Sequence, residues 1–168
     1  MELRHAHESD LPRIVEIYNA SIASRRSTAD TEPVTVASRL EWFQAHRPAR
    51  RPLLVHEEDN QIVGWISFED FYGRPAYRHT AELSIYLAPE SQGKQLGTKM
   101  VQAALALAPE LGLSTLVGYV FSHNLPSLKL LLSCGFTEWG CLPDVAEMDD
   151  KEYSVSILGK RLHEGNPR

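Results

Sequence analysis

The chain has 168 residues, 43% of them hydrophobic, and a formal net charge of −5 at pH 7. This length allows one well-filled core and is short for two, so we expect a single domain over residues 1–168. The 17 basic residues are scattered among 22 acidic ones. Because binding to a phosphate backbone requires clustered Lys and Arg, this distribution argues against nucleic acid as a main partner.

Composition also predicts a reduced, cytoplasmic protein. The two cysteines, Cys134 and Cys141, are too far apart for a Cys-x-x-Cys motif, and the seven histidines show no metal-ligand spacing. We therefore expect free thiols and no metal. The N-terminal segment MELRHAHESD is charged rather than apolar, and no run approaches the ~18 apolar residues that a membrane span requires. The sequence thus predicts a soluble protein without a membrane partner.

Extended and helical patterns follow one another along the chain. A short strand near Leu3 precedes a helix over residues 9–22, with Pro12 in its first turn. A second helix is expected over 36–46, where Thr35 can serve as the N-cap. Further strands are expected at residues 53–57, 62–68, 80–87, 114–120, 136–142 and 152–162, and further helices at 96–108 and 123–135. The pattern predicts a mixed α/β domain of about seven strands and four helices.

The strand at 80–87 leads into a polar, glycine-bearing turn and then directly into a helix. A helix that opens from such a loop presents unpaired N–H groups and the positive end of its dipole, which together suit a phosphate. A P-loop is excluded because neither Ser nor Thr follows Lys94, and a dinucleotide fingerprint lacks its three glycines. Two readings remain, a looser pyrophosphate site or an ordinary strand-to-helix turn. The candidate pyrophosphate residues are Gln92, Gly93, Lys94, Gln95, Leu96, Gly97 and Thr98.

This loop resembles the pyrophosphate motif of the GNAT acyl-CoA N-acetyltransferases, Q/R-x-x-G-x-G/A, at Gln92 and Gly97. Gln95 stands where the first glycine is expected, so strain or an altered loop follows if that position requires a positive φ. A second segment resembles the family pattern N-x-x-[AS]-x-x-L-[YH]-x-x-x-G-F, and its matching residues are Asn124, Ser127, Leu130, Gly135 and Phe136. The resemblance implies acetyl-CoA as co-substrate and one GNAT-like domain with a central mixed, mostly antiparallel sheet.

The N-terminal part carries a narrower resemblance, to the phosphinothricin and methionine sulfoximine or sulfone acetyltransferases. The matching residues are Tyr18, Asn19, Thr31, Glu32, Pro33, Arg39 and Trp42. This resemblance implies acetylation of the α-amino group of a small amino-acid-like compound, a role in detoxification and a homodimer. The C-terminal part departs from it, because Glu152 and Ser154 stand where the phosphinothricin enzymes have Trp and Asp.

Acetyl transfer to an amine requires a group that removes the ammonium proton. Period-two alternation over 80–87 places Glu82, Ser84 and Tyr86 on one face of the strand. A carboxylate there can accept the proton directly or through water, and partial burial would raise its pKa toward a useful range. The resemblance implies the same role for Glu82. The alternative is a solvated strand glutamate.

The resemblance also implies where the two substrates bind. The cofactor arm would follow the backbone of Ile85, Tyr86 and Leu87. Asn124 either contacts that arm or caps the short helix, with Ser127 in its first turn. The loop before Glu82 offers a wall and a guanidinium fork for a substrate carboxylate, or else is simply solvated. The candidate substrate residues are Tyr72, Gly73, Arg74, Arg78 and Ser84.

No general acid is assigned, because Leu131 stands where the family often has Tyr or His. A thiol with a pKa of about 8.5 can leave as thiolate without much protonic help. We therefore expect an acetyl-CoA-dependent N-acetyltransferase that acts on a small amine, with Glu82 as general base. Two alternatives stay open: a protein or peptide N-acetyltransferase of the same fold, and a non-catalytic acyl-CoA sensor, to which Gln95 and Leu131 point.

Overall fold

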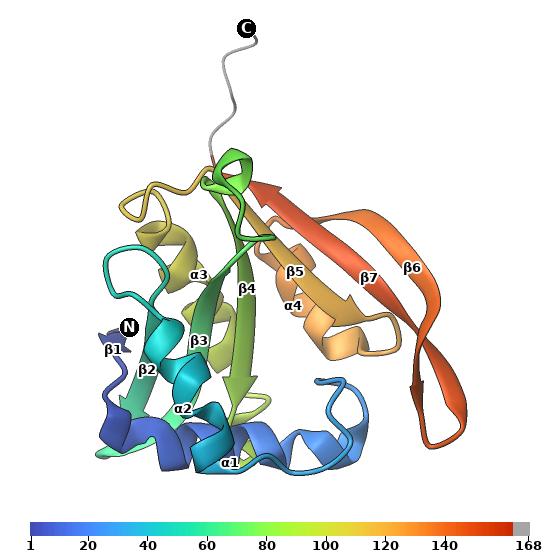
Figure 1. Cartoon of the computed structure of the whole chain (residues 1–168), viewed down its shortest axis with the longest axis horizontal. Coiled ribbons are helices and arrows are strands. Elements are labelled where there is room, and N and C mark those ends of the chain that lie inside the picture. The colour runs from blue at the N-terminus through green and yellow to red at the C-terminus, as the bar shows by residue number, and fades with distance from the viewer. Residues whose placement is uncertain (163–168) are drawn as a thin grey trace, which may run out of the picture.

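A computed structural model describes residues 1–162 and contains one seven-stranded sheet with helices on both faces (Figure 1). The strands are β1 (Arg4–His5), β2 (Leu53–Glu58), β3 (Gln61–Asp70), β4 (Thr80–Leu87), β5 (Thr115–Phe121), β6 (Thr137–Met148) and β7 (Lys151–Arg161). The helices are α1 (Leu11–Ala20), α2 (Val36–Ala45), α3 (Leu96–Leu107) and α4 (Leu125–Ser133), with short 3-10 turns at Glu8–Asp10, Ile22–Ser24, Pro75–Tyr77 and Pro89–Ser91. The predicted fold class is confirmed.

The strand order is β1-β2-β3-β4-β5-β7-β6, and every pair is antiparallel except β4 with β5. β3 and β4 stay paired from Gly64↔Leu87 to Asp70↔Ala81. β4 and β5 pair only from Thr80↔Thr115 to Glu82↔Val117. Beyond Glu82 these two central strands diverge, as Figure 1 shows. The mostly antiparallel sheet is thus confirmed, and its one parallel junction is the place where it opens.

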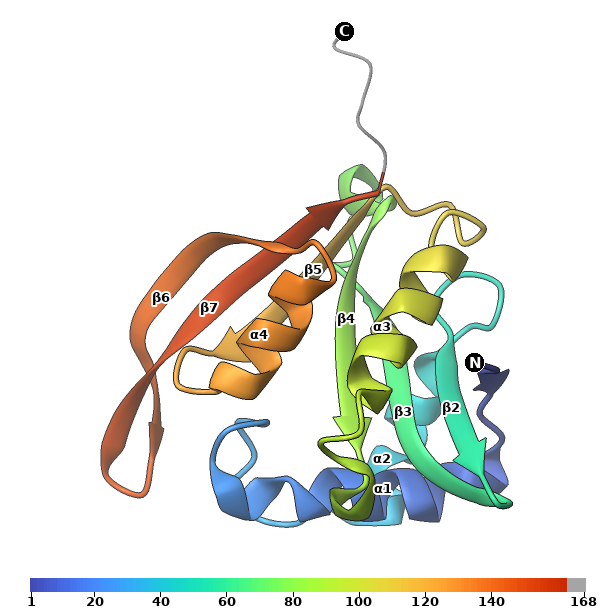
Figure 2. The ribbon, with the colours of Figure 1, turned by 180° about the vertical axis from the view of Figure 1, so that it is seen from behind.

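Two hydrophobic clusters bind the helices to opposite faces of the sheet. On one face lie α3 and α4 (Figure 2). They pack over a cluster whose members include Ile66, Phe68, Leu83, Met100, Val101, Leu116, Leu131 and Phe136. On the other, α1 and α2 pack over a cluster that includes Leu11, Ile14, Ile17, Tyr18, Val55 and Trp65. Alternation along β3 and β4 separates the two sets, because Phe68 opposes Leu83 on one face while Trp65 opposes Tyr86 on the other.

The starts of α2 and α4 and the end of α4 follow their predicted local signals. Thr35 caps α2, its hydroxyl accepting the N–H of Ser38 at 3.1 Å. Asn124 caps α4, its Oδ1 accepting the N–H of Ser127 at 3.3 Å. A glycine with φ of +86°, Gly135, follows α4 and allows the chain to turn into β6. None of the helices within residues 1–162 is long and apolar enough to cross a membrane.

The β6–β7 hairpin is longer than predicted. The sequence suggests that the first of these strands ends at residue 142, before Pro143, whereas β6 continues to Met148. The pairing register shifts between Leu142 and Ala146, so Pro143 lies in a bulge. The alternation of side chains alone does not predict this bulge. The real turn is Asp149–Asp150, both at positive φ (53° and 59°), as a tight hairpin requires. Residues 163–168 of the predicted domain lie outside the described residues.

Candidate active site

A cleft of about 330 Å³ lies where β4 and β5 diverge. One wall is β4, another is β5 with α4 beside it, and the segment 26–29 lies across the end. The lining residues are Arg26, Ser27, Thr28, Ala29, Glu82, Leu83, Ser84, Ile85, Tyr86, Gly118, Tyr119, Val120, Phe121, Asn124, Ser127, Leu130, Leu131 and Val155. The structure therefore brings Glu82, Ser84, Ile85, Tyr86, Asn124 and Ser127, all predicted site residues, to one cavity.

The edge of β4 that faces the cleft has no neighbouring strand beyond Glu82 in the described part of the chain. The N–H of Ala88 donates to the carbonyl of Val63 on β3 at 2.9 Å. Because successive peptide groups of a strand point to opposite sides, Tyr86 also points toward β3, whereas Ile85 and Leu87 point into the gap. The predicted backbone ladder thus consists of Ile85 and Leu87, and the main chain of Tyr86 belongs to the sheet.

Glu82 is the titratable carboxylate of this cleft. Its side chain is half-buried and shares a face with Ser84 and Tyr86, as alternation predicted. Burial raises the pKa of Glu82 above its ordinary value, and the carboxylate of Glu69, directly opposite on β3, raises it further. Both effects disfavour the charged form of Glu82. A carboxylate tuned in this direction suits a general base that works near neutral pH.

Tyr119 of β5 also lines the cleft and was not among the predicted site residues. Burial raises the pKa of Tyr119, and the nearby Tyr72 and Glu82 raise it further, so the phenol keeps its proton. Its neighbour two residues earlier, Val117, pairs with Glu82 in the parallel register. Alternation along 114–120, read together with that register, is the signal that would have found it. Tyr72, a predicted substrate residue, therefore lies near the site beside Tyr119.

The other predicted substrate residues are exposed and do not line the cleft. Tyr72 and Gly73 both have positive φ, 55° and 63°. Arg74 and Arg78 are exposed and are not among the residues that line the cleft. Arg78 contacts its own loop, its guanidinium donating to the carbonyl of Pro75 at 3.5 Å. Their binding of a substrate carboxylate stays a prediction.

The segment 25–30 crosses the end of the cleft and is tied down from three directions. The side chain of Asn124 donates to the carbonyl of Arg26 at 3.0 Å, and the hydroxyl of Tyr86 donates to that of Ser27 at 3.1 Å. Arg25 forms an ion pair with Asp149 of the hairpin turn at 2.8 Å. Sequence reasoning missed this segment, because Tyr86, Asn124 and Asp149 are each more than 50 residues away from the residues that they contact. Asn124 is shown to cap α4, and its contact with a cofactor stays a prediction.

The loop before α3 has the features of an anion site. α3 begins at Leu96, and the side chain of Gln95 makes no capping hydrogen bond to it, so the N–H groups of the first turn point outward. Gln95 has φ of +60°, in the left-handed region that the family motif fills with glycine. The condition under which Gln95 costs strain is therefore met. A Cβ at Gly97 would lie 2.4 Å from Cδ1 of Leu130, so this glycine permits the close packing of α3 on α4.

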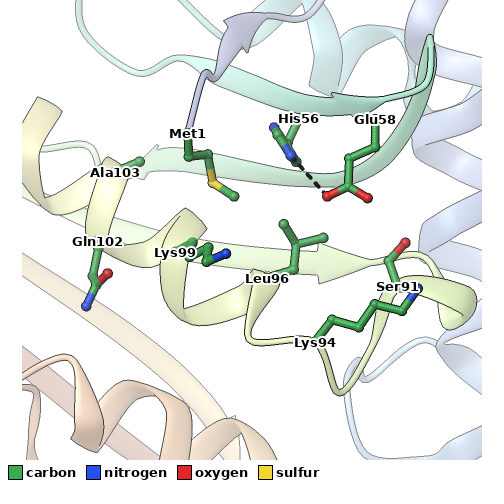
Figure 3. Close-up of a pocket in the computed structure, with 9 residues that line it drawn as sticks. All are labelled: Met1, His56, Glu58, Ser91, Lys94, Leu96, Lys99, Gln102 and Ala103. Atoms are coloured by element: carbon green, nitrogen blue, oxygen red, sulfur yellow. Dashed lines mark ion pairs between the residues drawn. The ribbon is translucent and has the colours of Figure 1, made fainter.

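Lys94 lines a separate hollow on the side of α3 that faces β2 (Figure 3). Lys99 reaches the same hollow, where His56 and Glu58 of β2 lie 3.5 Å apart. Neither lysine is among the residues that line the cleft between β4 and β5. A contribution of Lys94 to pyrophosphate binding stays a prediction. Within residues 1–162, no three His, Cys, Asp or Glu side chains are grouped as metal ligands.

Comparison with known proteins agrees with this geometry. YwnH of Bacillus subtilis, provisionally named a phosphinothricin acetyltransferase, is 53% identical over 163 residues, 96% of this chain and 99% of YwnH. The L-amino acid N-acyltransferase MnaT of Escherichia coli is 32% identical over 98% of this chain and 95% of its own. The L-methionine sulfoximine/L-methionine sulfone acetyltransferase of Salmonella typhimurium is 33% identical over 98% and 96%.

Solved structures give the same result. A crystal structure of a protein provisionally named a phosphinothricin N-acetyltransferase superposes with a TM-score of 0.94 at 52% identity, covering 97% of this chain and 99% of that one. The phosphinothricin acetyltransferase of Sinorhizobium meliloti in complex with acetyl-CoA has a TM-score of 0.90 at 26% identity, covering 98% and 90%. Residues 1–137 match the acetyltransferase (GNAT) domain family. The chain is thus an enzyme of the GNAT acetyltransferase family, as its motifs predicted.

Proposed function

We propose that this enzyme transfers the acetyl group of acetyl-CoA directly to the amino group of a small amino-acid-like compound of the phosphinothricin or methionine sulfoximine type. The observation that carries the proposal is the half-buried Glu82, with its raised pKa, beside the unpaired edge of β4. The names of the relatives, which act on amino acids or their analogues, support the substrate class.

The cleft suits the cofactor in two respects. The peptide groups of Ile85 and Leu87 face the gap and would pair with the amides of a pantetheine arm, as an added strand pairs with a sheet edge. The uncapped first turn of α3 would bind the pyrophosphate through its N–H groups. When bound, acetyl-CoA supplies an activated acyl group. The chain's own residues line the cleft, hold the two substrates in place and supply the base.

Glu82 accepts the proton of the substrate ammonium, directly or through water, and so frees the nitrogen lone pair. The nitrogen then bonds to the thioester carbonyl carbon, the carbon–sulfur bond breaks, and its electron pair leaves on sulfur. A thiol of pKa about 8.5 needs little protonation to depart, which agrees with Leu131 at the position of the missing acid. Arg74 and Arg78, which are exposed on the loop before β4, would bind the carboxylate of the substrate.

The proposal is tested by measuring thiol release from acetyl-CoA with methionine sulfoximine, phosphinothricin, polyamines and short peptides. We expect turnover on the two amino-acid analogues. Glu82→Gln should lower kcat/KM for them at least tenfold near pH 7, because general-base catalysis contributes about 10²–10⁴-fold. Below the raised pKa of Glu82 the base is protonated, so wild-type activity should fall as the pH falls through that pKa.

A matched control is Glu138→Gln, an exposed position on β6 that is not among the residues lining the cleft. It should keep full activity. Turnover on peptides alone would replace the substrate class with a protein or peptide acceptor. Binding of acetyl-CoA without turnover on any amine would instead favour the non-catalytic sensor.

We also propose that the enzyme is a homodimer. β6 is an edge strand, and it exposes three large apolar side chains, Trp139, Leu142 and Val145. Exposed apolar groups along an unpaired edge are typical of an interface. Sedimentation equilibrium should give twice the mass of the chain, and Val145→Lys should shift the mass toward that of one chain. A single-chain mass for the wild type would contradict the proposal.

A further inference from the structure

The carboxylates of Glu69 and Glu82 occupy opposite positions on β3 and β4, on the same face of the sheet. Like charges directly opposite each other destabilise a pair of strands. Within residues 1–162, neither carboxylate forms an ion pair with Lys, Arg or His. The fold therefore keeps two acids together without a basic side chain between them. Such an arrangement favours a cation from outside the chain.

Glu69 is held in place by α2. Its Oε1 accepts the indole N–H of Trp42 at 3.2 Å, which leaves the second oxygen for another partner. Trp42 in turn packs edge-on against His46, with ring centroids 4.8 Å apart. Burial lowers the pKa of His46, so this ring stays neutral and provides no counter-charge near neutral pH.

Other charged or titratable groups on the neighbouring elements have different partners or are uncharged. On α2, the guanidinium of Arg39 lies over the rings of Tyr18 and Trp42, at 4.8 and 4.9 Å from their centroids. On β5, Tyr119 keeps its proton. None of these groups neutralises both acids.

We propose that Glu69 and Glu82 together form the ammonium-binding site, in which Glu69 holds the cation while Glu82 removes its proton. This inference rests on the proposed function, since it concerns how the acceptor amine of that reaction is bound. The proton passes from the substrate nitrogen to a carboxylate oxygen of Glu82. Glu69 takes no proton in this step and orients the nitrogen toward the thioester. The site then requires a protonated amine as the form that binds.

The direct test is Glu69→Gln, which preserves the volume of the side chain and an acceptor for Trp42. KM for the amine should rise about tenfold, the effect of losing one hydrogen bond to a charged group. KM for acetyl-CoA should stay within twofold. Removing the neighbouring negative charge lowers the pKa of Glu82, so the acid limb of the kcat/KM profile should move to lower pH. Glu138→Gln is the matched control and should change neither parameter.

A second measurement separates this inference from the proposed function. The pH titration of the Glu82 carboxyl, followed by NMR on protein with ¹³C-labelled glutamate, needs no turnover. Its midpoint should fall in Glu69→Gln, and the affinity for methionine sulfoximine, measured by calorimetry, should fall about tenfold. If no amine is acetylated but both changes occur, the ammonium site stands and the transfer reaction does not. An unchanged midpoint or an unchanged affinity overturns the inference.

Discussion

β4 has two edges, and they differ in what the chain does with them. Toward β3 the strand is paired along nearly its whole length, and the side chains at this junction, such as Phe68 and Trp65, lie in the two cores. Toward β5 it is paired only from Thr80 to Glu82, and the rest of the edge faces the cleft. The closed junction therefore holds the fold together, whereas the open junction leaves backbone groups free for a ligand. One strand serves both purposes because its peptide groups alternate.

The closed junction should affect stability much more than binding. Phe68 is fully buried opposite Leu83, so Phe68→Ala should lower the free energy of unfolding by about 3–5 kcal/mol through lost contacts and a cavity. Urea denaturation measures this loss. At a temperature well below the transition, the Kd for acetyl-CoA should stay within twofold of wild type. Phe68→Leu should show a smaller loss of stability of the same kind. A tenfold change in Kd in either variant would contradict the prediction that the junction with β3 affects stability and not binding.

The open junction should show the reverse. In Ile85→Pro the N–H that faces the gap is lost, while the sheet loses no hydrogen bond to β3. The Kd for acetyl-CoA, measured by calorimetry, should rise about tenfold, which corresponds to about 1.4 kcal/mol for the missing donor. Ile85→Val keeps the donor and should bind normally. Equal affinities in the two variants would mean that the backbone of β4 does not bind the cofactor.

The smallest effect is expected at the loop that joins the open edge to α3. Gln95→Gly removes a side chain from a left-handed residue, which relieves ~1 kcal/mol, and part of this is offset by the greater freedom of the unfolded chain. The free energy of unfolding, measured by thermal denaturation, should therefore rise by about 0.5 kcal/mol. The affinity for acetyl-CoA should not fall. Gln92→Gly is the control. Gln92 is extended, with φ of −71°, so glycine relieves no strain there and should lower the stability of the protein. A lower melting temperature for Gln95→Gly would contradict the inference that Gln95 is strained.

How far the sequence predicts this molecule depends on the range of each signal. Alternation over 80–87 correctly groups Glu82, Ser84 and Tyr86, and cap residues such as Thr35 place the helix ends, because these signals are local. The family, and with it the central sheet, could be predicted from short motifs in register. The opposing carboxylate of Glu69 could not, because strand register is a tertiary property.

The errors have the same origin. The proline in β6 is tolerated by a bulge that only the pairing with β7 shows, so the strand was expected to end too early. The segment 26–29 lacks any periodicity, and its contacts with Tyr86 and Asn124 join distant parts of the chain. The substrate role predicted for Arg74 and Arg78 is not one of these errors, because both side chains are exposed outside the cleft lining and their binding of a carboxylate stays a prediction.

The ion pair between Arg25 and Asp149 links the segment at the end of the cleft to a hairpin near the C-terminus. Arg25 begins the segment that crosses the cleft, and Asp149 is the first residue of the turn that joins β6 to β7. The GNAT family match ends at residue 137, before this turn. The segment at the end of the cleft is therefore held partly by a stretch outside that match. A substitution in this turn can thus change how the end of the cleft is held without altering any residue of β4.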